Sequence, residues 1–212
     1  MNLRTGMGIF LLLCCSTAST ALAQQGGQGG AAGQKAAPTI TSVLQFQLAI
    51  VERETVGLAE AMPEDKYSFA PTNGNFAGVR TFAQQVKHIA TVNDRFWDSI
   101  TGATPPAAPD EGIASNGPDA LVTKAQIVEY LKDSYARGHK AIATINADNA
   151  VTPLANPAVP FLNTRMALAV FACAHNMDHY GQIVEYLRDN GGTPPSSAQR
   201  PPANPPAAAP KQ

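Results

Sequence analysis

The chain has 212 residues, and its composition excludes several classes of protein. Fifteen basic and 16 acidic side chains give a formal net charge of −1, and the basic residues form no cluster. Nucleic-acid binding needs a basic footprint, so we expect no nucleic-acid partner. After the N-terminal segment no apolar run approaches the ~20 residues of a spanning helix, so we expect no membrane span in the mature chain.

The first 23 residues are typical of a secretory signal peptide. Arg4 precedes the apolar run 7–15, and an Ala-Leu-Ala sequence ending at Ala23 forms a cleavage site before Gln24. The apolar run is about half as long as a membrane anchor. We therefore predict cleavage between Ala23 and Gln24 and an exported protein, either periplasmic or secreted.

The cysteines and the two ends of the mature chain define one domain without disulfides. Only Cys173 remains after cleavage, and its apolar surroundings predict a small buried side chain. Residues 24–38 are rich in Gln, Gly and Ala, which predicts a flexible leader. Residues 196–212 are rich in Pro and Ala, which predicts a disordered tail, and we expect extended polyproline conformation from Pro194 onward. The folded domain is predicted at 39–195.

Four stretches of helical periodicity, separated by Pro- and Gly-containing segments, predict an all-α four-helix bundle. The long loop 101–117 is expected to cross one end of the bundle. The predicted helices cover residues 42–61, 76–100, 119–146 and 163–190.

Each predicted helix has a periodic set of apolar positions. In the first helix these include Val43, Phe46, Ile50, Leu58 and Met62. The second helix has an inward stripe made of Phe82, Val86, Ile89, Asn93, Phe96 and Ile100. The stripe of the third consists of Val128, Leu131, Tyr135, Gly138, Ile142 and Ile145.

The fourth helix has an inward seam that is polar in its middle. The seam consists of Leu168, Ala172, His175, His179, Gln182 and Tyr186. Unpaired burial of two imidazoles and an amide would cost a few kcal/mol, so these groups need partners. His175 and His179 lie one turn apart and can reach one metal ion about 2 Å from each nitrogen. Alternatively, they are core histidines satisfied by neighbouring side chains or water.

A third ligand must come from another helix, where His88 and His139 are the candidates. Helical angles place His88 at the flank of its apolar stripe and His139 somewhat nearer its own. His139, however, lies between Arg137 and Lys140, which prefer solvent. The pattern leaves the choice open.

Two segments resemble the DinB/YfiT-like metalloenzyme family. Residues 175–188 read H-x-x-x-H-x-G-Q-x-x-x-Y-L-R, as in the family's final helix, and residues 80–90 resemble its second helix. The resemblance covers residues 42–195. It implies a four-helix bundle that binds one divalent ion (zinc, nickel, iron or manganese) through His88, His175 and His179, and it gives His139 no role.

The resemblance implies less about the reaction. Characterised relatives include transferases and isomerases that use low-molecular-weight thiols, but an oxidising compartment supplies reduced thiols poorly. Tyr180 also stands where relatives often carry a basic residue, which weakens an anionic-substrate role at that position.

The leading functional hypothesis is an exported metal-dependent hydrolase or transferase that acts on a small molecule. Asn93, Asp178 and Gln182 are candidates for orienting ligands or substrate, although Asp178 is equally compatible with a solvated helix surface. No catalytic residue is identified, and a homodimer is compatible with the sequence. One alternative is a non-enzymatic exported metal- or ligand-binding bundle, and another is a purely structural role for the histidines.

Overall fold

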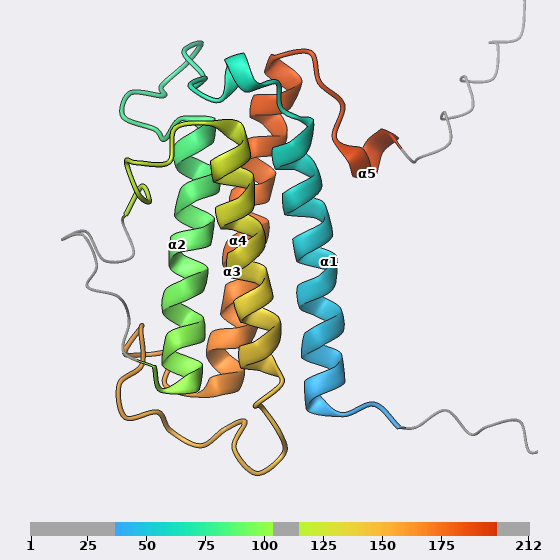
Figure 1. Cartoon of the computed structure of the whole chain (residues 1–212), viewed down its shortest axis with the longest axis vertical. Coiled ribbons are helices and arrows are strands. Elements are labelled where there is room, and N and C mark those ends of the chain that lie inside the picture. Colours follow the sequence, from blue (N-terminus) through green and yellow to red (C-terminus); the bar gives the residue numbers. More distant parts are fainter. Residues whose placement is uncertain (1–36, 104–114, 199–212) are drawn as a thin grey trace, which may run out of the picture. The chain divides into compact units, whose positions relative to one another are not determined.

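A computed structural model describes residues 37–103 and 115–198 and shows a bundle of four main helices (Figure 1). The predicted all-α class is confirmed. The predicted signal peptide with its Ala23/Gln24 cleavage site, most of the leader and the tail beyond residue 198 lie outside the described residues. The helices are α1 (Ile40–Ala61), the short 3-10 helix η1 (Glu64–Lys66), α2 (Phe82–Thr101), α3 (Lys124–Ile142), α4 (Arg165–Asp189) and the one-turn α5 (Pro195–Ala198).

The four long helices do not alternate in direction along the chain. α2 and α3 are parallel neighbours, because Thr91 contacts Tyr130 and, further along both helices, Asp98 contacts Arg137. α4 runs antiparallel to α2 and parallel to α1 (Figure 1). The end of α2 and the beginning of α3 therefore lie at opposite ends of the bundle (Figure 1). Most of the loop 101–117, which we expected to cross one end, lies outside the described residues.

A threonine caps the N-terminus of each long helix. Thr39, Thr81 and Thr123 form capping boxes, in which the threonine hydroxyl accepts from the backbone N–H three residues later. Thr164 caps α4 in the same way but without the reciprocal bond. These caps explain why α2 begins at Phe82 rather than residue 76, and why α3 begins at Lys124 rather than residue 119.

The inward stripes of α2 and α3 are buried as predicted, and so are Leu58 and Met62 of the first helix, but the beginning of that helix differs from expectation. Val43 and Phe46 are 57% and 69% exposed, whereas Leu44, Leu48 and Val51 are buried. α1 packs against α3 and α4 through this second set, because both sets fit a helical repeat and only the neighbouring helices select one of them.

The beginning of the C-terminal tail is also different. We expected extended polyproline conformation from Pro194, but residues Pro195–Ala198 form one helical turn. The hydroxyl groups of Ser196 and Tyr180 lie 2.9 Å apart, which ties this turn to α4. Within the described ranges, no helix combines the length and apolarity needed to cross a membrane.

Gly138 allows α3 to approach α2 closely at the bundle centre. A Cβ atom added there would lie 2.8 Å from the ring of the buried Trp97 and 3.0 Å from Leu48. Such distances force neighbouring groups to move, and Trp97 has no space to do so cheaply. The small residue that the sequence places in the stripe is therefore required by packing.

We predict that Gly138→Ala lowers the free energy of unfolding by about 1–3 kcal/mol, because it overpacks the core against Trp97. Gly181→Ala is the matched control, since a Cβ there meets nothing within 4 Å. Alanine is favoured over glycine inside a helix by roughly 0.5–1 kcal/mol, so the control should be neutral or stabilising. Denaturant unfolding of both variants measures the difference, and equal stabilities would contradict the packing argument.

Candidate metal centre

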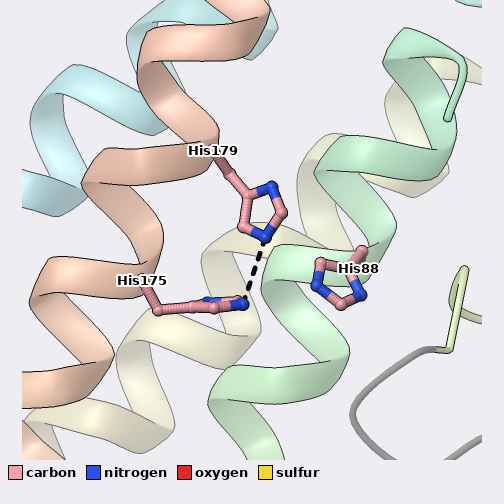
Figure 2. A group of neighbouring side chains, drawn as sticks. All are labelled: His88, His175 and His179. Carbon is pink, nitrogen blue, oxygen red and sulfur yellow. Dashed lines mark hydrogen bonds between the residues drawn. The ribbon is translucent and has the colours of Figure 1, made fainter. Parts of the chain in front are cut away.

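Three histidines from two helices converge inside the bundle. His88 projects from α2, and His175 and His179 project from α4, so that the rings face one another (Figure 2). One nitrogen of each ring lies within 4.8 Å of the corresponding nitrogens of the other two. His88 and His179 are buried, and His175 is half-buried. The structure thus brings together the three histidines that the resemblance selected.

The antiparallel contact between α2 and α4 brings these side chains to one level. On one side of the cluster, the rings of Phe96 and Phe171 pack with their centroids 5.8 Å apart. On the other side, Nε2 of Gln85 donates to Oε1 of Gln182 at 2.8 Å. The cluster therefore lies between an apolar contact and a polar bridge across the same pair of helices.

The orientation of the rings leaves their Nε2 atoms available. Nδ1 of His88 lies 2.6 Å from the carbonyl oxygen of Ser115, which only accepts, so Nδ1 carries the proton and Nε2 keeps its lone pair. The Nε2 atoms of His175 and His179 lie 3.1 Å apart. Nitrogens bound at about 2.0–2.1 Å to a tetrahedral ion are roughly 3.3 Å apart, so this spacing suits two ligands of one ion.

Burial keeps the three imidazoles neutral. It lowers the pKa of His88 to about 4 and that of His179 to about 3, and it also lowers the pKa of His175. The other histidines and Arg80 lower the pKa of His179 further, because their positive charges oppose protonation. Neutral imidazole is the form that coordinates a metal, so the site is already in its metal-binding protonation state at neutral pH.

Comparison with known families agrees with this geometry. A family model described as the DinB superfamily matches residues 47–183, a span that includes all three histidines. The chain belongs to the DinB superfamily. No curated protein matches the chain significantly.

Solved structures share the fold of this DinB-superfamily chain at low identity. A conserved protein from Enterococcus faecalis is 16% identical, with a TM-score of 0.55 over 72% of this chain and 97% of its own. A DinB-like protein from Bacillus cereus ATCC 10987 is also 16% identical, with a TM-score of 0.55 and coverage of 74% and 96%. A protein assigned to the DinB family from Exiguobacterium sibiricum 255-15 is 16% identical, with a TM-score of 0.53 over 74% of this chain and 95% of its own.

The other predicted site residues lie in different surroundings. Gln182 is exposed rather than inward, and besides the bridge to Gln85 it donates to Oδ2 of the exposed Asp178 at 3.1 Å. The Asp178 carboxylate opposes the burial that lowers the pKa of His175. Asn93 is fully buried, and its amide donates to Oγ of Ser134 at 3.4 Å in the contact between α2 and α3. Roles for these three residues beside the site stay predictions.

His139 lies elsewhere, on the side of α3 that faces α1. Its Nε2 is 2.9 Å from Glu52 Oε2, and its Nδ1 contacts the amide oxygen of Gln45. We had expected this side chain to face solvent, but it is about one third exposed and held by two α1 residues. The Glu52 carboxylate and the Gln45 amide on α1 are hydrogen-bond partners of His139 that the sequence pattern of α3 alone cannot predict.

Sequence reasoning assigned no role to several residues around the cluster. Ser115 and Asn116 come from the segment before α3, where no periodicity marks them. Gln85 lies one turn before His88 and is 3% exposed. A polar residue on the buried face of the helix was the sequence feature that could have identified it. Cys173 is buried as predicted, and burial raises the pKa of its thiol to about 11, which makes it a poor nucleophile at neutral pH.

We predict that acid destabilises the metal-free protein through the histidine cluster. The unfolded chain binds protons on these residues near pH 6.5, whereas folded His88 and His179 bind them only near pH 4 and 3. The unfolded state therefore binds more protons as the pH falls below 6.5, and stability is lost toward the folded pKa values. Asp94 has the opposite effect on stability. Burial raises its pKa to about 6, so the folded state binds a proton there at a higher pH than the unfolded state does, and acid stabilises the fold at this residue.

Thermal unfolding in the presence of a chelator at pH 7.5 and pH 5 measures this effect. The wild type should melt at a lower temperature at pH 5, and His179→Gln should reduce the drop because glutamine does not titrate. An equal drop in both proteins would show that other groups cause the acid sensitivity.

Proposed function

We propose that this DinB-superfamily protein binds one divalent metal ion through His88, His175 and His179 and acts as a metal-dependent hydrolase or transferase on a small molecule. The observation that carries the proposal is the convergence of three imidazoles, two buried and one half-buried, whose nitrogens lie within 4.8 Å of one another. Zinc, nickel, iron and manganese are all candidates, and imidazole ligands suit the first three particularly well.

The donor set fits a cation better than it fits a packed core. Three neutral histidines are gathered in one place at the desolvation cost of burying polar rings, and the Nε2 atoms of His175 and His179 lie 3.1 Å apart. Apolar side chains would fill this volume without that desolvation cost. A cation offsets the cost by using the lone pairs that the rings direct toward one another. These features support the proposal over a purely structural role.

The chemistry of the proposed reaction divides between the ion and the chain. Held by three neutral ligands with a coordination position left open, a divalent ion acts as a Lewis acid that polarises a substrate carbonyl or activates a water or thiol. The chain holds the His88 tautomer through Ser115 and keeps the imidazoles deprotonated through burial. The Gln85–Gln182 bridge places amide groups one turn from the histidines, where they can position a substrate.

Two further points belong to this proposal. The sequence of residues 1–24 supports export, which would place the site in the periplasm or outside the cell. A non-enzymatic bundle that stores or senses the same ion is the alternative. Turnover assays with metal-loaded protein on ester, amide and thiol-transfer substrates separate these two functions, because only an enzyme would lose turnover when a chelator removes the ion.

The ligand set is tested by metal content after single substitutions. We predict that His88→Ala, His175→Ala and His179→Ala each cut metal occupancy strongly, because two imidazoles bind far more weakly than three. An ion at ~100 times its dissociation constant adds roughly 2.7 kcal/mol to folding stability, and each variant should lose most of this gain. Elemental analysis of identically purified proteins gives the occupancy.

His139→Ala is the matched control for this experiment. His139 contacts Gln45 and Glu52 on α1 and lies outside the cluster, so its loss should leave occupancy near the wild-type level. If His139→Ala empties the site while His88→Ala keeps it filled, the proposed ligand set is wrong at that position.

Export makes a separate prediction. If the cleavage site between Ala23 and Gln24 is used, mass spectrometry of protein from the envelope or culture fraction should find an N-terminus at Gln24. A dominant cytoplasmic species that keeps Met1 would refute export and would make a reduced thiol cofactor more plausible.

A further inference from the structure

An apolar pocket of about 410 Å³ lies between the C-terminal part of α4 and the segment that leads into α2. These two parts of the chain lie at the same end of the bundle (Figure 1). The apolar walls of the pocket are formed by Pro71, Phe76 and Val79 from the segment and by Tyr186 from α4. A pocket of this size, lined by apolar side chains with a few polar groups, is typical of a small-molecule site.

The two walls of this pocket differ in how they are held. Tyr186 is only 6% exposed, its hydroxyl donates to the backbone carbonyl of Arg80 at 3.1 Å, and its ring packs edge-on against Phe69. Phe76 and Val79, by contrast, are 41% and 37% exposed. The aromatic wall is therefore fixed before any ligand binds, whereas the exposed apolar side chains opposite it would gain stability when a ligand covers them.

The apolar pocket continues into a polar pocket of about 520 Å³, because Val79 and Gln182 line both. Gln182 lies one helical turn after His179, and Tyr186 lies one turn further along α4. At 1.5 Å of rise per residue, the apolar pocket is roughly 10 Å along the helix axis from the histidine cluster. A single elongated small molecule can therefore reach both the proposed ion and the apolar pocket.

The charged residues of the apolar pocket disfavour an anionic occupant. Two charged residues line it, and both are exposed carboxylates on α4, Glu185 and Asp189. Glu185 pairs at 2.7 Å with Arg188, which does not line the pocket. The walls thus present no cation to a carboxylate or a phosphate, and like charges would oppose its binding. An uncharged apolar group is the occupant that these walls favour.

We propose that this pocket binds an uncharged aromatic or aliphatic group of the substrate, while the polar reacting group of the same molecule reaches the ion at the histidine cluster. This inference rests on the proposed metal site and specifies its substrate class as an elongated small molecule with one apolar end. Phe76, Val79 and Tyr186 are then residues that determine specificity, and Gln182 lies where the apolar and polar pockets meet.

The test uses the full chain loaded with zinc, with metal content measured first. Hydroxamates are the probes, because their two oxygen atoms chelate zinc whatever group they carry. Acetohydroxamate has no apolar end, whereas 5-phenylpentanohydroxamate carries a phenyl ring on a chain long enough to span the distance to the pocket. In calorimetric titration we expect the long probe to bind at least about tenfold more tightly, because its ring and chain leave water.

Two substitutions in the pocket and one matched control follow. Val79→Asp should weaken binding of the long probe by about tenfold, because it places a charge beside an apolar group. Phe76→Ala should also weaken it, because less apolar surface is buried. Both variants should change acetohydroxamate affinity by less than about twofold, since neither residue contacts the histidines. Val122→Asp is the control and should leave both affinities unchanged, because Val122 is 74% exposed and lines neither pocket.

The outcomes separate this inference from the proposed metal site. Equal affinity of the wild type for the two probes would overturn the inference, and so would an undiminished advantage of the long probe in both pocket variants. If the wild type retains no zinc, the metal proposal fails, and amide chemical shifts during titration with 5-phenylpentan-1-ol test the pocket alone. Shifts centred on Val79 and Tyr186 would then support the apolar site, and their absence would overturn it.

A second copy of the chain is the competing occupant of this apolar surface. Sedimentation of the wild type and of Val79→Asp distinguishes the two cases. A change from dimer to monomer in the variant, with both probe affinities unchanged, would assign the surface to an interface between copies and overturn the inference.

Discussion

Burial of three neutral imidazoles between α2 and α4 is the constraint on which the rest of this site depends. A helix interface normally gains stability from apolar side chains, and each buried imidazole forgoes part of that gain. Low pKa values for His88 and His179 follow from the same burial. This cost is offset elsewhere in the bundle, because the apolar stripes of α2 and α3 are buried, with Trp97 only 1% exposed and Tyr135 fully buried between the helices. A well-packed core thus supports a costly polar cluster at one contact.

The centre combines rigid and irregular parts of the fold. Helices supply the three proposed ligands, so their spacing is fixed by helical geometry and by the α2–α4 contact. The segment before α3 supplies Ser115, which holds the His88 ring, and Asn116, which holds Arg80. The proposed metal ligands tolerate little displacement, so they are best placed on rigid helices, while the groups that orient them come from the connection before α3.

Much of the helical architecture could be predicted from the sequence, and the errors of that prediction have specific physical causes. Periodicity located the four helices, but the capping threonines Thr81 and Thr123 decide where α2 and α3 begin, and they are a readable signal that periodicity ignores. Periodicity also could not choose between the two apolar sets of α1, of which Phe46 is exposed and Leu48 is buried. Gln182 fits the inward seam by angle, yet its side chain is exposed and lines a pocket, where it accepts a hydrogen bond from Gln85 of α2.

The sequence by itself determined the helical class and the one-turn pair His175 and His179, whereas the family motif indicated His88 only by resemblance. Local repeats encode these features, because residues four apart on a helix share a face in any fold. Only the tertiary structure decided that His88 and not His139 reaches the pair. His88 and His139 both lie on helical faces flanked by polar residues. The packing of α2 against α4 brings His88 to the cluster, whereas the packing of α3 against α1 places His139 beside Gln45 and Glu52. Which faces meet depends on contacts between distant segments, and no local pattern contains that information.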